Sequence, residues 1–269
     1  MNEHINPALQ ASLESCASGR SYGGIAVRRE ASVPEAIGLL KPDDHLVSLV
    51  SPATMEAEQY RTLSLMLEQR RHSGLFQVVA ISSPTLGDGK TMTSINLAGA
   101  FAQSPDVRVV LIDIDFRKSS IPAQLGLRDP QLLGFRDAII NPALSLNDIV
   151  HRLPGWNLSL VTAGRSQVMP HEIFKSSRFS ELIDEARRDF DWIILDTAPL
   201  MLTPDCLTIG RNVDGFVMVV CAHKTSRKEV GEALDILGPS KLVGLVFNSD
   251  DGLVKSYKYQ PYFLPSQSA

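Results

Sequence analysis

Short runs of apolar residues, separated by segments of helical periodicity, constrain the fold of this 269-residue chain more than any other feature. Several of these runs are apolar at nearly every position, which is typical of strands that are buried on both faces. The six runs lie at 76–81, 109–112, 158–161, 192–195, 216–220 and 242–247. Amphipathic segments after Lys90 and over 178–190 and 227–237 predict helices. The alternation predicts an α/β fold with a mostly parallel central sheet and helices on both faces.

Three regions follow from changes in this pattern along the chain. Residues 1 to about 45 show no sustained periodicity and are rich in Ser, Ala and Gly, which predicts a flexible N-terminal extension at 1–45. One α/β domain is expected at 46–250, followed by a flexible tail that contains tyrosines at 251–269. The domain is expected to begin with a short strand at 45–50 and a helix that Thr54 caps and that runs to about Arg71.

The charge balance and the cysteines argue against several classes of protein. Lys and Arg number 26 against 30 Asp and Glu, so the formal net charge is -4 and the bulk electrostatics do not favour nucleic acid as a partner. Three scattered cysteines form no CxxC pair, which argues against a disulfide framework and favours a cytoplasmic location. No apolar run approaches the roughly 20 residues that cross a bilayer, and the first residues do not read as a signal peptide. Attachment to a membrane therefore requires a partner.

The segment 82–91, SSPTLGDGKT, has the features of a phosphate-binding loop. It follows a predicted strand and opens a predicted helix, whose first amides attract anions. Gly87 and Gly89 allow backbone angles that other residues avoid. Lys90 adds a full charge for the β- and γ-phosphates, and the Thr91 hydroxyl can ligate Mg²⁺. Pro84 replaces the first glycine of the usual pattern, so a glycine-rich turn without a ligand is the competing interpretation. The nucleotide-binding candidates here are Thr85, Leu86, Gly87, Asp88, Gly89, Lys90, Thr91 and Met92.

Acidic residues end two of the predicted strands. The run at 109–112 leads into Asp113 and Asp115, and the run at 192–195 leads into Asp196. The carboxyl ends of parallel strands meet at one edge of an α/β sheet, so these side chains are expected beside the loop. Arg117 shares the face of Asp113 and Asp115 if the segment stays extended. Carboxylates gathered at one place repel one another unless a cation holds them, which favours a Mg²⁺ site over three ordinary strand-end turn residues.

These motifs resemble those of the bacterial tyrosine kinases (BY-kinases) of polysaccharide export systems, over roughly residues 46 to 262. The family has a Walker A loop, which matches 83–91, a Walker A′ motif, which matches LIDIDFR at 111–117, and a Walker B motif, which matches DTAP at 196–199. The resemblance implies a P-loop NTPase fold of the MinD/ParA type, and it makes 46–250 a P-loop kinase domain. Related partition and division-site ATPases carry a signature lysine where this chain has Thr85, which argues against those relatives.

The resemblance also implies a reaction, in which the γ-phosphate of ATP is transferred to a tyrosine with Mg²⁺ as cofactor. The catalytic candidates are Lys90, Asp113, Asp115 and Asp196, and the metal candidates are Thr91, Asp113 and Asp196. Asp115 or Asp113 accepts the proton of the tyrosine hydroxyl, and the residues do not distinguish the two. Arg117 and Asn248 join the loop residues as nucleotide-binding candidates.

Three of the five tyrosines lie near the C-terminus and are the phospho-acceptor candidates, Tyr257, Tyr259 and Tyr262. Similar proteins phosphorylate tail tyrosines of a neighbouring subunit. This chain would then be an autokinase that regulates exopolysaccharide or capsule polymerisation and export. Each phosphate adds roughly -1.5 to -2 charge, so modified tails would repel one another in an oligomer. The competing interpretation is that these aromatic side chains only pack the tail onto the domain.

Partners also follow from the resemblance, and one departure from the family affects them. The family implies a membrane-spanning chain-length-determinant protein that recruits the kinase to the inner face of the plasma membrane. A homo-oligomer and a cognate tyrosine phosphatase are further partners that it suggests. Subunit contacts in the family use Glu-x-x-Arg-x-x-Arg, and here Glu58 and Arg61 fit but Ser64 stands last. A hydroxyl cannot replace a guanidinium fork, so the pattern disfavours ring assembly or requires other contacts, such as Arg70 and Arg71.

Two other functions compete with an autokinase. In the first, the protein is a non-kinase P-loop ATPase switch, in which nucleotide binding alone controls assembly of a polysaccharide export complex. Ser64 and the small number of tail tyrosines are compatible with it. In the second, the protein is a small-molecule kinase or ligase, which needs a substrate-pocket motif that we do not find in the sequence. Phosphotyrosine formation with MgATP distinguishes an autokinase from a switch.

Overall fold

The structure is a computed structural model of the chain, and it describes residues 41–71, 76–127, 132–166 and 169–250. Every described residue belongs to the unit that spans 33–269. Nearly all of the predicted extension at 1–45 and all of the predicted tail at 251–269 lie outside the described residues. The fold below is therefore that of the predicted α/β domain.

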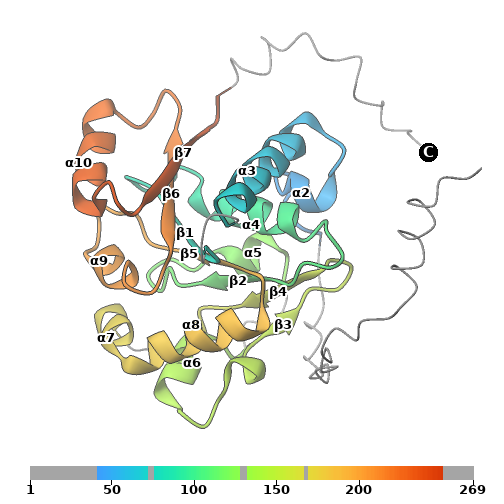
Figure 1. Cartoon of the computed structure of the whole chain (residues 1–269), viewed down its shortest axis with the longest axis vertical. Helices are drawn as coiled ribbons and strands as arrows, with labels where there is room; N and C mark the ends of the chain where they lie inside the picture. The colour runs from blue at the N-terminus through green and yellow to red at the C-terminus, as the bar shows by residue number, and fades with distance from the viewer. Residues whose placement is uncertain (1–40, 72–75, 128–131, 167–168, 251–269) are drawn as a thin grey trace, which may run out of the picture. The chain divides into compact units, whose positions relative to one another are not determined.

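Seven strands of the described chain form one sheet, in the order β3-β4-β2-β5-β1-β6-β7 (Figure 1). Their bounds are β1 (Val78–Ser82), β2 (Val109–Asp113), β3 (His151–Arg152), β4 (Leu158–Val161), β5 (Trp192–Asp196), β6 (Gly215–Cys221) and β7 (Leu242–Asn248). Neighbouring strands are parallel, except that β3 runs antiparallel to β4. All six strands that the apolar runs predict are present, and the mostly parallel sheet is confirmed.

Helices cover both faces of the sheet. One face carries α2 (Val47–Val50), α3 (Met55–Arg71), α4 (Lys90–Phe101) and α5 (Ile121–Gln124). The other carries α6 (Phe135–Ile140), α7 (Pro170–Lys175), α8 (Ser177–Asp189), α9 (Asp205–Ile209) and α10 (Arg227–Leu237). A short 3₁₀ helix lies at Leu146–Asp148. The three helices that the sequence predicts after residue 75 correspond to α4, α8 and α10.

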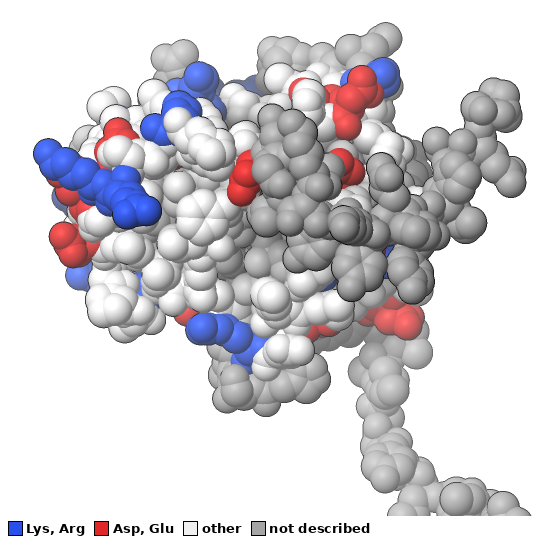
Figure 2. Space-filling model, turned by 90° about the horizontal axis from the view of Figure 1, so that it is seen from above, with Lys and Arg blue, Asp and Glu red and all other residues white. Residues whose placement is uncertain are grey.

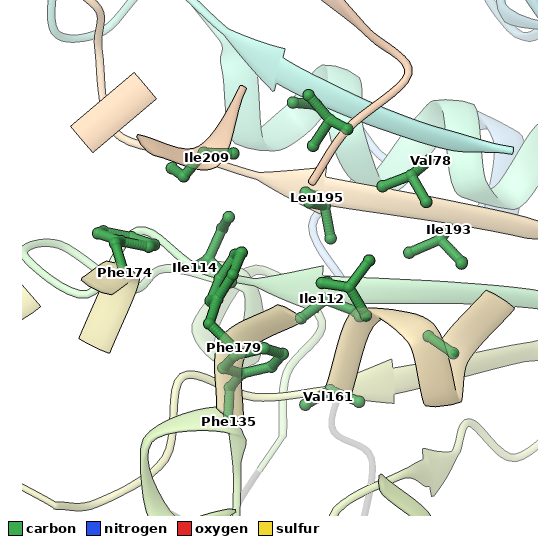
Figure 3. Packing of buried hydrophobic residues seen from close by; sticks show 14 of the residues in the cluster. Val78, Ile112, Ile114, Phe135, Val161, Phe174, Phe179, Ile193, Leu195 and Ile209 are labelled. Carbon is green, nitrogen blue, oxygen red and sulfur yellow. The ribbon is translucent and has the colours of Figure 1, made fainter. Parts of the chain in front are cut away.

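Two apolar clusters, one on each face, explain why the central strands lack the usual alternation. Successive side chains of a strand point to opposite faces, so in β1 Val78 packs into one cluster and Val79 into the other. Figure 3 shows the first cluster, where Ile112 and Leu195 of the sheet lie near Phe179 of α8. Burying one such side chain stabilises the folded state by about 1.5–3 kcal/mol, and these strands bury the side chains on both of their faces.

The short strand expected at 45–50 is wrong, because this segment packs on α4 instead of joining the sheet. Residues 47–50 form α2, and the Ser48 N–H donates to Asn96 Oδ1 at 2.9 Å. The Asn96 amide in turn donates to the His45 carbonyl at 3.0 Å. A polar side chain on α4 thus satisfies backbone groups that a strand would pair. The cap on the next helix is present, since the Ala57 N–H donates to Thr54 Oγ1 at 3.3 Å.

The surface of the described domain carries charges of both signs. Figure 2 shows one face of it, on which Lys and Arg are interspersed with Asp and Glu among uncharged residues. Charges mixed in this way are typical of a solvated surface rather than of a field built to attract one polyanion. Within the described residues, no helix combines the length and the hydrophobicity of a bilayer span.

Candidate active site

The predicted phosphate-binding loop connects β1 to the N-terminus of α4, at the carboxyl edge of the sheet. Two of its glycines adopt the left-handed conformation, Gly87 with a φ of 74° and Gly89 with a φ of 94°. A Cβ atom at Gly89 would collide with the side-chain amide of Asn248. Both positions therefore require glycine, for the backbone angle and, at Gly89, for the close approach of β7.

Lys90 begins α4, and its ammonium group lies among the acidic side chains that the sequence singles out. Its Nζ is 2.7 Å from Asp115 Oδ2 and 3.9 Å from Asp196 Oδ2. The side chain is 11% exposed, so this cation is nearly withdrawn from solvent. The structure thus brings together residues that are 25 and 106 positions apart in the chain.

The two strand-end carboxylates lie side by side, because Asp113 of β2 and Asp196 of β5 are partners in the parallel register. Both residues are fully buried. Asp196 accepts hydrogen bonds from Thr91 Oγ1 at 2.7 Å and Ser94 Oγ at 3.0 Å. Asp113 accepts one from Ser119 Oγ at 2.7 Å. Sequence reasoning missed Ser94 and Ser119, although Ser94 could have been found as the residue one helical turn after Lys90.

Burial and mutual repulsion perturb the ionisation of this cluster. Burial, together with Asp196 and Asp115, raises the pKa of Asp113 to about 7, against the hydrogen bond from Ser119. Burial also raises the pKa of Asp196, although Lys90 and two hydroxyls oppose it. Burial alone would lower the pKa of Lys90, but the nearby carboxylates outweigh it and raise that pKa. The site therefore holds a fixed positive charge and an excess of acidic groups.

The donor set of this cluster fits Mg²⁺ better than a metal held entirely by protein. No group of three His, Cys, Asp or Glu side chains in the described ranges is arranged to hold a metal ion. Mg²⁺ usually takes one or two carboxylates and fills the remaining positions with water and phosphate oxygens. Asp113 and Asp196, with the Thr91 hydroxyl, supply that kind of oxygen set, while Asp115 is paired with Lys90.

Arg117 does not join the cluster. β2 ends at Asp113, and the following residues turn, so the extended geometry that would keep Arg117 on the face of Asp115 is lost. Its guanidinium lies 3.3 Å from Asp205 on α9 and is 47% exposed. The expectation of one shared face is therefore wrong, and the assignment of Arg117 to nucleotide binding stays a prediction.

The other nucleotide-binding candidates lie within the loop or next to it. Asn248 donates to the Asp88 carbonyl at 3.1 Å, and the Asp88 carboxylate accepts the Thr85 N–H at 2.9 Å. Leu86 is half exposed at the tip of the loop. Met92 and Asn248 both line a cavity of about 490 Å³. The cavity extends between α3 and the end of β7, with Tyr60, Leu63, Val246 and Phe247 among its lining residues.

The three motif positions on α3 make contacts within the described domain. Glu58 and Arg61 form an ion pair of 3.0 Å, and Arg61 donates to Gln103 at 3.1 Å. Ser64 is buried, and its hydroxyl donates to the Arg61 carbonyl at 2.8 Å. The side chain at the third position therefore points into the domain.

Sequence comparisons find relatives of this chain among tyrosine-protein kinases. A family model described as an AAA domain matches residues 76–213. The tyrosine-protein kinase YwqD of Bacillus subtilis is 30% identical over 206 residues, which are 76% of this chain and 85% of that protein. The tyrosine-protein kinase CpsD of Streptococcus pneumoniae is 30% identical over 186 residues, which are 67% of this chain and 79% of that protein.

Solved structures agree with the sequence relatives. The VpsO kinase domain is 30% identical, with a TM-score of 0.65 over 76% of this chain and 95% of that one. The kinase domain of the Escherichia coli tyrosine kinase ETK shares the fold at 23% identity, with a TM-score of 0.70 over 76% of this chain and 79% of that one. The MinC:MinD complex of Aquifex aeolicus shares it more distantly, at 19% identity and a TM-score of 0.52 over 64% of this chain and 67% of that one. The MinD-like P-loop architecture that the sequence predicts is confirmed.

Proposed function

This chain belongs to the family of bacterial P-loop tyrosine-protein kinases, and on that premise we propose that it transfers the γ-phosphate of ATP to protein tyrosine. The observation that carries the proposal is the placement of Lys90, at the start of α4 and within 4 Å of both Asp115 and Asp196. A glycine-rich loop, a buried lysine and strand-end carboxylates at one sheet edge are what phosphoryl transfer requires for binding and charge stabilisation.

The residues that would hold ATP are arranged in order from the loop to the cavity. The amides of the loop and the N-terminus of α4 face the phosphates, and Lys90 neutralises part of their charge. The adjoining cavity of about 490 Å³, lined by Met92 and Asn248, is of the size that ligand pockets have and takes the nucleoside. Asp113, Asp196 and Thr91 would hold Mg²⁺, which would neutralise part of the phosphate charge.

Asp115 is the better candidate for the base that accepts the tyrosine proton. Asp113 and Asp196 are register partners on adjacent strands, so they suit a shared cation. Asp115 lies beyond the end of β2, and its carboxylate accepts hydrogen bonds from Lys90 Nζ at 2.7 Å and from the backbone N–H of Lys118 at 3.0 Å. When Lys90 turns to a phosphate, the Asp115 carboxylate is released and can accept a proton from an incoming hydroxyl.

The acceptor tyrosines lie in the tail in this proposal. Tyr60 is the one tyrosine within the described residues, and it lies half-buried on α3 and lines the cavity, where burial raises the pKa of its hydroxyl. Such a hydroxyl is a poor acceptor because it is neither free nor easily ionised. Tyr257, Tyr259 and Tyr262 lie outside the described residues and are the acceptors that we propose.

The cellular role that we propose is regulation of exopolysaccharide or capsule polymerisation and export. A membrane-spanning adaptor protein would recruit the kinase from the cytoplasm to the inner face of the membrane, and a tyrosine phosphatase would reverse the modification. Co-purification of the kinase with an adaptor from solubilised membranes tests the recruitment. A kinase that remains in the soluble fraction when its adaptor is present contradicts it.

A non-kinase nucleotide switch is the second candidate, and Ser64 favours it. The residue is buried and bonded within α3, so the family's third subunit-contact side chain is missing. Without that contact, delivery of one subunit's tail to the next subunit's site requires another interface. Hydrolysis of ATP without any phosphotyrosine would support the switch.

Residue-by-residue mass spectrometry of the purified full chain with MgATP tests the kinase proposal. We expect phosphotyrosine in the wild type and in Lys228→Met, an exposed lysine of α10 that serves as the matched control. Lys90→Met and Asp196→Asn should show none while retaining the circular dichroism of the wild type. Wild-type protein that binds MgATP but yields no phosphotyrosine contradicts the kinase assignment.

A further inference from the structure

A second acidic group lies inside the phosphate-binding loop itself, apart from the cluster around Lys90. The carboxylate of Asp88 is fully buried. It accepts the Thr85 N–H at 2.9 Å and the hydroxyl of Thr225 at 2.8 Å. These bonds fix the turn of the loop and connect it to the segment between β6 and α10.

A negative charge at this place opposes the function of the loop. The loop receives the phosphates of a nucleotide, which carry several negative charges, and Coulomb repulsion is strong where solvent is excluded. The hydrogen bonds of Asp88 come from neutral donors, so they orient the carboxylate without cancelling its charge. A loop of this composition binds an anion well only if a cation compensates Asp88.

Lys224 supplies a cation at that position. It lies in the turn between β6 and α10, and its Nζ is 3.6 Å from Asp88 Oδ1. The same ammonium group donates to the Leu86 carbonyl at 2.6 Å. A Cβ atom on Gly87 would be 3.0 Å from it, so Lys224 lies directly against the tip of the loop. Its side chain is half exposed and its partner is fully buried.

We propose that Lys224 is a positioning residue for nucleotide binding, which neutralises Asp88 and holds the tip of the loop in the shape that receives phosphates. The inference rests on the proposed nucleotide-binding function and adds a residue to it. Lys224 acts through Asp88 and Leu86 rather than on the phosphates. At position 85, where related partition and division-site ATPases carry a lysine, the Thr85 hydroxyl lies against Asp88.

A double-mutant cycle on Lys224 and Asp88 tests this, with isothermal titration calorimetry of MgATP and MgADP on the full chain. We expect Lys224→Met to weaken the binding of both nucleotides about tenfold, because it leaves the buried Asp88 carboxylate without its half-exposed cation. Asp88→Asn keeps an oxygen for the Thr85 amide and removes the charge. In that background Lys224→Met should change either affinity by less than about twofold. Lys228→Met is the matched control and should bind like the wild type.

Several outcomes overturn the inference. If Lys224→Met lowers nucleotide affinity equally in both backgrounds, the lysine contacts phosphate directly. If Lys224→Met leaves the affinity of the otherwise wild-type protein unchanged, the lysine has no role in nucleotide binding. If Asp88→Asn fails to fold, Lys224→Arg decides, because an arginine keeps the charge and should bind within about threefold of the wild type. A loss in Lys224→Arg equal to that in Lys224→Met overturns charge compensation. Failure of the wild type to bind any nucleotide refutes the proposed function instead, so the two failures are distinguishable.

Discussion

Replacing Asp113 by asparagine should stabilise the metal-free, nucleotide-free protein at pH 8. This carboxylate is fully buried beside Asp196, and burial with the neighbouring carboxylates raises its pKa to about 7. In the unfolded chain the same group has its usual pKa of 3.8. Because the folded state holds the proton more tightly, folding becomes less favourable as the pH rises from about 4 to 7. Above pH 7 the full cost of the buried charge is present.

The magnitude follows from the pKa difference. About three pH units at 1.36 kcal/mol each give a destabilisation of about 4 kcal/mol at pH 8, and about 2 kcal/mol at pH 5. Asparagine removes this cost but has only one acceptor oxygen for the two donors, the Ser119 hydroxyl and the Asp115 backbone N–H. The weakened hydrogen bond lowers the free energy of unfolding by about 1 kcal/mol at either pH. We therefore expect a gain of about 3 kcal/mol at pH 8 and about 1 kcal/mol at pH 5.

Urea unfolding at both pH values, in EDTA and without nucleotide, measures the gain. Asp214→Asn is the matched control, since its carboxylate is held by Arg187 at 2.7 Å and its replacement should destabilise. Addition of MgADP should stabilise the wild type more than Asp113→Asn, because the variant lacks one of the three proposed Mg²⁺ ligands. A variant no more stable than the wild type at pH 8, or a gain equal at both pH values, refutes the assignment of a buried, repelled charge.

Two further predictions concern other parts of the domain. The pKa of Asp214 is lowered, because Arg187 and the backbone amides of residues 77 and 78 outweigh its burial, so its contribution is present above about pH 4 and is lost as the pH falls below that value. Asp214→Asn should therefore cost about 1–3 kcal/mol at pH 7 and less at pH 3, as measured by urea unfolding. Gly89→Ala forces a non-glycine residue to a φ of 94° and into Asn248, so calorimetry should find nucleotide affinity lost and scanning calorimetry a lower Tm. Gly231→Ala is its control, because a Cβ there meets nothing within 4 Å, and it should be neutral or stabilising by up to about 1 kcal/mol.

The sheet could be predicted because its central strands are buried on both faces. That burial requires unbroken apolar runs, and a run such as 192–195 is too short for a buried helix but has the length of a strand. β3 has two residues, too few to form such a run. The segment at 45–50 has a strand-like composition, but its structure depends on Asn96, a residue about fifty positions away. Long-range side-chain partners of this kind leave no local pattern.

Some residues of the site could be predicted from local motifs, and others are placed by contacts between segments that are distant in the sequence. Lys90 and Thr91 belong to a local motif, and Asp196 ends a strand whose neighbour in the sheet follows from the fold. Lys224 escaped the sequence analysis because its contact with Asp88 joins two loops that are 136 residues apart. Arg117 was misplaced for a related reason, since the two-residue period holds only while the backbone remains extended, and β2 ends at Asp113.

The distribution of charge around the loop distinguishes two kinds of acidic group. Asp88 has Lys224 beside it and is neutralised without a ligand. Lys90 Nζ lies 2.7 Å from Asp115 and 3.9 Å from Asp196. Within the described chain, this lysine is shared by the two carboxylates, and Asp113 has no cation within salt-bridge distance. The excess negative charge is therefore confined to the register pair at the ends of β2 and β5. We therefore expect a divalent cation to be stabilised most at this pair, where it would free Lys90 to turn from the carboxylates to a phosphate.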